Sequence, residues 1–73
     1  MAARKVRCAI AGTVLEVHKS PGEAVAAGEA VLTLECMKME IPIEAPAAGT
    51  IIRIEVQIGD TVAKDQLVFA FED

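Results

Sequence analysis

An internal repeat constrains the fold most, because the 73-residue chain aligns with itself without gaps at an offset of 37 residues. Residues 11–35 read AGTVLEVHKSPGEAVAAGEAVLTLE, and residues 48–72 read AGTIIRIEVQIGDTVAKDQLVFAFE. Glycines and apolar residues match in register, as Gly12 does with Gly49. Two copies are too few for a solenoid. The sequence therefore predicts two equivalent halves that pack face to face about a pseudo-two-fold axis.

Each copy carries the alternation that is typical of strands. Ile52, Ile54 and Val56 alternate with polar residues in the second copy, as Leu15 and Val17 do in the first. A period of two predicts a strand with one buried face. The later part of each copy repeats the pattern, with the inward phase at Leu32, Leu34, Phe69 and Phe71. Short strands separated by Gly-containing turns predict an all-β sandwich or barrel.

Length and composition limit what the chain can do. A chain of 73 residues allows one domain, over residues 1–73, with a marginal core. Hydrophobic residues make up 53% of the chain but aromatic residues only 3%, so small aliphatic side chains must fill that core. Such a chain has little room for a deep substrate cleft, and no catalytic constellation is present. We therefore expect no enzyme activity of its own.

Charge and hydropathy exclude several partners. The net charge is −4, and all acidic residues follow Arg7, so the folded body is acidic and a nucleic-acid partner is not expected. The basic start of the chain predicts a solvated, flexible arm over residues 1–5. No apolar run is long enough to span a membrane, and no secretory signal is present. We expect a cytoplasmic protein without a membrane partner.

Three further side chains have ordinary interpretations. Cys8 and Cys36 have no metal-ligand spacing with His18, so two free thiols are expected, with a disulfide between them as the alternative. His18 falls on the outward phase of its strand and has no partner for catalysis. Pro42 lies between two apolar residues and cannot donate to a sheet, so it is expected to blunt an exposed strand.

The segment between the two copies carries the candidate site. Alternating apolar residues before and after it predict two strands joined by a tight hairpin centred on Met37 and Lys38. Such a turn favours Asn-Gly, because both central residues need positive φ, and a non-glycine residue costs about 1 kcal/mol. Met37 and Met39 flank Lys38 as adaptable apolar groups. They form either an exposed recognition surface or, alternatively, a cover over the core beside an ordinary lysine.

The run Cys36-Met37-Lys38-Met39 resembles the attachment motif of biotinyl domains, which normally read Ala or Ser and then Met-Lys-Met. The resemblance extends from about Val6 to Glu72. It implies a barrel-sandwich hybrid of two four-stranded antiparallel sheets, with biotin covalently attached to Lys38 and with Met37 and Met39 read by a biotin protein ligase. It further implies a non-catalytic biotin carboxyl carrier, which shuttles a carboxyl group between biotin carboxylase and carboxyltransferase sites of a biotin-dependent carboxylase or decarboxylase.

The chain departs from that pattern in two ways, and alternatives stay open. Cys36 replaces the usual Ala or Ser, and no "thumb" insertion occurs near residues 19–21. A lipoyl carrier, or a carrier of both groups, is the main alternative, although lipoyl domains typically read Asp-Lys-Ala. An unmodified adaptor module is the second. The sequence leaves open the carboxylated substrate, the oligomeric state, and whether the chain is a free subunit or one domain of a carboxylase.

Overall fold

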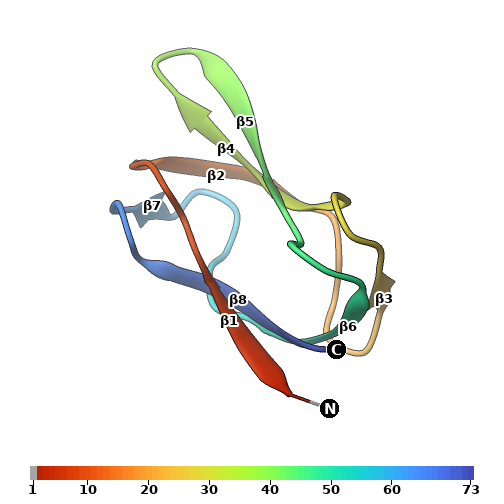
Figure 1. Ribbon diagram of the computed structural model, residues 1–73. Coiled ribbons are helices and arrows are strands. Elements are labelled where there is room, and N and C mark those ends of the chain that lie inside the picture. The colour runs from red at the N-terminus through yellow and green to blue at the C-terminus, as the bar shows by residue number, and fades with distance from the viewer. Residues whose placement is uncertain (1) are drawn as a thin grey trace.

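Two four-stranded antiparallel sheets form the computed structural model, which describes residues 2–73 (Figure 1). The first sheet has the order β1-β8-β6-β3 and the second the order β5-β4-β2-β7. The strands are β1 (Ala3–Arg7), β2 (Gly12–Val17), β3 (Ala24–Val25), β4 (Ala30–Cys36), β5 (Met39–Glu44), β6 (Gly49–Ile54), β7 (Thr61–Val62) and β8 (Leu67–Glu72). The predicted all-β sandwich is confirmed. Within residues 2–73, no helix is long and apolar enough to cross a membrane.

The repeat appears in the structure as a pseudo-two-fold relation between the sheets. The offset of 37 residues relates β2, β3 and β4 to β6, β7 and β8. The halves are not separate layers, however, because β3 pairs with β6 and β7 pairs with β2. Matching bonds tie the halves together: Gly22 N–H donates to the Ile51 carbonyl, and Gly59 N–H donates to the Val14 carbonyl, each at 2.8 Å. The two halves therefore form one interlocked core.

Aliphatic side chains and two phenylalanines fill the space between the sheets. The predicted inward phase of β4 and β8 is confirmed, because all four of its side chains are buried. The Phe69 and Phe71 ring centroids lie 6.2 Å apart, within the range of favourable aromatic pairs. The buried hydrophobic residues are Cys8, Val14, Val25, Val31, Leu32, Leu34, Ala45, Ile51, Val56, Val62, Val68, Phe69, Ala70 and Phe71.

The predicted inward phase of β2 and β6 is wrong at the start of each strand. The sequence pattern assigned Ile52 to the core, but Ile51 is buried and Ile52 is 39% exposed. The pairing register shifts between Ile51 and Arg53, and it shifts at the equivalent place in β2, next to Leu15. Each shift is a bulge, which inserts one residue and reverses the alternation. Tertiary packing therefore overrides the simple period of two.

The predicted flexible arm over residues 1–5 is also wrong where the structure describes it, while Met1 lies outside the described residues. Residues 3–5 begin the edge strand β1, which pairs with β8 along its length. Arg4 explains part of this order: its Nη1 lies 2.9 Å from Asp73 Oδ2, and its guanidinium lies 5.6 Å from the centre of the Phe71 ring. This ion pair lowers the pKa of the Asp73 carboxyl.

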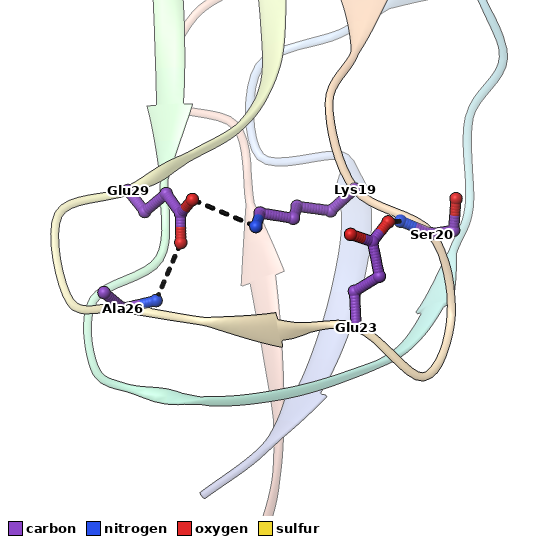
Figure 2. Close-up of polar contacts among 5 residues, drawn as sticks. All are labelled: Lys19, Ser20, Glu23, Ala26 and Glu29. Carbon is purple, nitrogen blue, oxygen red and sulfur yellow. Dashed lines mark hydrogen bonds and ion pairs between the residues drawn. The ribbon is translucent and has the colours of Figure 1, made fainter.

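Four turns share one device, in which a side chain accepts a hydrogen bond from the backbone N–H three residues earlier. The donor and acceptor pairs are Ser20 and Glu23, Ala26 and Glu29, Gln57 and Asp60, and Ala63 and Gln66, at 2.7–2.9 Å. Figure 2 shows the first two, together with an ion pair between Lys19 Nζ and Glu29 Oε2 at 3.0 Å. The Ala26 N–H, and then Lys19, lower the pKa of Glu29.

Candidate functional site

A two-residue turn joins β4 to β5, and Lys38 is its second residue. Met37 has φ 52° and Lys38 has φ 67°, so both occupy the left-handed region. Cys36 and Met39 are paired on either side of the turn. Positive φ at both central residues is the geometry of a type I′ hairpin. The hairpin predicted over Met37 and Lys38 is therefore confirmed, including its unfavourable backbone.

The side chains at this turn point away from the core. Met37 is 91% exposed and Met39 is 65% exposed, so the alternative in which the methionines cover the core is wrong. Lys38 is exposed and, among residues 2–73, it makes no ion pair or side-chain hydrogen bond. The side-chain amino group of Lys38 is therefore accessible to another protein.

The fold holds this lysine at one end of an elongated molecule. The molecule measures 36 × 18 × 17 Å, and Figure 1 shows the β4–β5 hairpin at the end opposite to the start of β1 and the end of β8. Below the turn, Leu34 is buried and pairs with Ile41, which anchors the hairpin in the sandwich. Pro42 lies on the edge strand β5, as predicted. A base that packs into the sandwich thus carries a turn that projects into solvent.

The strands next to the turn are acidic. Glu35 and Glu40 are exposed and lie directly opposite each other on β4 and β5, so their side chains share one face. Glu44 is exposed farther along β5. Like charges on neighbouring strands are unfavourable for folding. They also create a negative potential beside Lys38, which attracts basic surfaces.

The other side chains that the sequence analysis considered occupy ordinary positions in the structure. Cys8 and Cys36 are free thiols, as expected; Cys8 is buried and donates to the Ala63 carbonyl at 2.8 Å, whereas Cys36 is half-buried. His18 is exposed, with Nε2 2.8 Å from Thr33 Oγ1. Residues 2–73 contain no pocket and no group of three or more His, Cys, Asp or Glu that could hold a metal ion. The candidate site is therefore a side chain on a protruding turn.

Comparison with known proteins identifies the family. The model of the family described as "Biotin-requiring enzyme" matches residues 4–71, which is nearly the whole chain. The chain belongs to the biotin/lipoyl attachment family. This confirms the family that the sequence motif indicated, together with the lipoyl-like fold of two four-stranded sheets.

The similar proteins include a biotinylated protein, a carboxylase and a lipoyl domain. The chain is 39% identical to a "Biotinylated protein TB7.3 homolog" of Mycobacterium leprae, over 90% of this chain and 93% of that protein. It is 44% identical to a pyruvate carboxylase of Staphylococcus aureus, over 84% of this chain but only 5% of that protein. It also resembles the lipoyl domain of the Azotobacter vinelandii 2-oxoglutarate dehydrogenase complex, with a TM-score of 0.79 and 31% identity over 94% of this chain and 95% of that domain.

The described residues fit a covalently held prosthetic group. A group joined to a lysine needs an accessible amine and space around it, and the exposed Lys38 at the end of the hairpin offers both. The second copy of the repeat also has an exposed lysine in a turn, Lys64. In that turn only the neighbouring Asp65 has positive φ, whereas Met37 and Lys38 both do. Lys38 thus differs from the other lysines in its exposed methionine neighbours.

Proposed function

We propose that this protein is a biotin carboxyl carrier in which biotin is attached through an amide bond to Lys38 Nζ. One observation carries the proposal: Lys38 is exposed and without a side-chain partner among residues 2–73, between two exposed methionines at the end of a hairpin whose base packs into the sandwich. The methionine flanks match the biotinyl motif, whereas lipoyl domains typically have an acidic and a small flank. The relatives named above include a biotinylated protein of nearly the same length.

The protein contributes presentation rather than catalysis. Attached biotin supplies a ureido ring that accepts and releases a carboxyl group. The four-carbon stem of Lys38 adds reach and flexibility to the attached group. The hairpin fixes the base of that arm, so the arm sweeps a limited volume and its effective concentration at a docked active site is high. Weak docking then suffices, and weak docking also permits release.

Three partners follow from this proposal. A biotin protein ligase acylates Lys38, and Met37 and Met39 provide the apolar contacts by which it selects this lysine. A biotin carboxylase and a carboxyltransferase then meet the loaded arm in turn. The pyruvate carboxylase match supports this assignment, because a domain like this chain occurs within that enzyme. The cytoplasmic location expected from the sequence remains a prediction.

The decisive experiment is the intact mass of the protein after coexpression with a biotin protein ligase and excess biotin. We expect one added biotinyl group on the wild type and none on Lys38→Arg. Lys64→Arg is the matched control, because it removes an exposed turn lysine from the other half, and it should be loaded as the wild type is. An unmodified wild type, or a loaded Lys38→Arg variant, contradicts the proposal.

The lipoyl alternative is supported by the match to the lipoyl domain, whose length the chain covers almost completely. The same preparation is therefore offered a lipoate ligase with lipoate. Under the biotin proposal, lipoylation is absent or much slower than biotinylation. Efficient lipoylation together with absent biotinylation reverses the assignment, and efficient loading by both enzymes identifies a dual carrier.

A further inference from the structure

We propose that Met37 and Met39 form an oxidant-sensitive switch that controls loading of Lys38. In this proposal, which rests on the proposed function, hydrogen peroxide converts the two thioethers to sulfoxides and the ligase then no longer acylates the lysine. Each thioether sulfur gains one oxygen atom and loses two electrons, while one peroxide molecule is reduced to water. The reaction needs no catalytic group from this chain.

Exposure determines which methionines react. Met37 is 91% exposed and Met39 is 65% exposed, and within residues 2–73 these are the most exposed large apolar side chains together with Ile58 at 67%. Susceptibility to oxidation follows exposure. Met37 lies in the turn itself, whereas Met39 begins β5 opposite Cys36. We therefore expect Met37 to be oxidised faster than Met39.

Because the two methionines lie outside the core, their oxidation should affect recognition by the ligase and leave the fold intact. Neither belongs to the buried cluster between the sheets, so their oxidation removes no core contact. A sulfoxide is nevertheless polar, where the thioether is apolar. Oxidation thus changes the chemistry of the surface around Lys38 while the hairpin keeps its shape. Damage to a buried methionine would instead disrupt the core.

Loading falls because the ligase must bury a polar group where it buried an apolar one. The negative strands beside the turn, with Glu35 opposite Glu40, leave the methionines as the apolar contacts next to the lysine. An uncompensated polar group at an interface lowers affinity by about tenfold or more. We therefore expect kcat/KM for biotinylation to fall by about tenfold or more when both sulfurs are oxidised.

Cys36 is the competing oxidation site and must be removed from the test. Its thiol is free and half-buried, two residues from Lys38 and paired with Met39. A Cys36→Ser variant keeps the small size of the side chain. Cys8 is buried and donates to the Ala63 carbonyl, so it is retained. Peptide mapping after oxidation then assigns each added oxygen to a residue.

The experiment treats Cys36→Ser protein with hydrogen peroxide, removes the peroxide, and measures the initial rate of biotin addition by intact mass. Methionine sulfoxide reductases, one for each epimer, then treat half of the sample. The expected result is a rate reduced by about tenfold or more that reductase restores, with unchanged far-UV circular dichroism. The control Met37→Leu/Met39→Leu in the same background keeps its own rate after peroxide.

The possible outcomes separate this proposal from the proposed function. An unchanged rate despite mapped sulfoxides overturns the switch, and so does a loss that reductase does not reverse. If reduced Cys36→Ser protein and reduced wild type are both never biotinylated, the proposed function itself fails. If the leucine control is not loaded even before peroxide, the rate of partly oxidised samples is compared with the mapped fraction of Met37 sulfoxide, and a lack of correlation overturns the switch.

Discussion

At the scale of the residue, the turn at Met37 and Lys38 sets local stability against function. Both residues have positive φ, which costs a non-glycine residue about 1–2 kcal/mol. Asn-Gly is the pair that a type I′ turn favours. The sequence uses Met-Lys instead, and these two side chains are the ones through which the protein is proposed to act. Local strain at a functional position is a recurring pattern.

Replacing the turn should therefore stabilise the protein and abolish loading. For Met37→Asn/Lys38→Gly we expect the free energy of unfolding to rise by about 1–2 kcal/mol, because both new residues tolerate positive φ. Urea denaturation measures the change, and intact mass measures the loss of biotin addition. Met37→Leu/Lys38→Arg keeps the unfavourable backbone and should show no gain. An equal or lower stability of the Asn-Gly variant contradicts this account of the turn.

At the scale of the element, much of the fold could be predicted from the sequence. The gapless repeat identified corresponding strands, and the alternation in β4 and β8 identified their inward faces correctly. The bulges in β2 and β6 could not be found this way, because a run such as Ile51-Ile52 offers two apolar candidates for one inward position. The edge strand β1 was missed because its side chains are mostly basic, although Val6 and Ile43 match at the offset of the repeat.

The bulge in β6 can be tested with two neighbouring isoleucines. Ile51 is 1% exposed and Ile52 is 39% exposed. We expect Ile51→Ala to lower the free energy of unfolding by about 2–5 kcal/mol, because it leaves a cavity in the core. For Ile52→Ala we expect about 1 kcal/mol or less. Urea denaturation of both variants is the measurement. Equal losses, or a larger loss at Ile52, would contradict the bulge and support a regular strand in which Ile52 faces the core.

The turn between β3 and β4 should make stability depend on pH. Glu29 accepts a hydrogen bond from Ala26 N–H and pairs with Lys19, and both interactions lower the pKa of Glu29 below its ordinary value of 4.5. A carboxyl whose pKa is lowered by folding stabilises the protein above its unfolded pKa. This contribution is therefore present above about pH 4.5 and lost as the pH falls through the lower folded pKa.

Glu29→Gln tests this dependence, because the equivalent turn uses Gln66 to accept the same backbone hydrogen bond from Ala63. We expect the variant to retain the turn. When the pH is lowered from neutral to below 4.5, the variant should lose less stability than the wild type. Thermal unfolding across this interval is the measurement. Identical pH profiles for the two proteins would show that ionised Glu29 adds nothing to stability.

At the scale of the whole molecule, the pseudo-two-fold relation places the start of β1 and the end of β8 where the other half has its hairpin. The offset of 37 relates Cys36 to Asp73 and Met39 to Ala2. As Cys36 and Met39 pair beside their turn, the Asp73 N–H donates to the Ala2 carbonyl at 3.2 Å. Arg4 holds the same end through its ion pair with Asp73. A two-residue turn between Asp73 and Ala2 would therefore join the two ends of the chain as a second hairpin.

A cyclic protein in which Asn-Gly joins Asp73 to Ala2 should fold with a second type I′ turn and be more stable than its linear counterpart. The ends already lie in hairpin register, so closure adds little strain to the folded state, while it removes conformational entropy from the unfolded chain. For a ring of this size we expect a gain of up to about 4 kcal/mol in the free energy of unfolding.

The comparison is urea denaturation of the cyclic protein and of a linear chain that carries the same two residues at its end. Because the new turn lies far from Lys38, biotin addition to the original hairpin should proceed at the wild-type rate. A cyclic protein of unchanged or lower stability would mean that β1 and β8 do not keep this register in solution. The pseudo-two-fold relation would then not extend to the ends of these two strands.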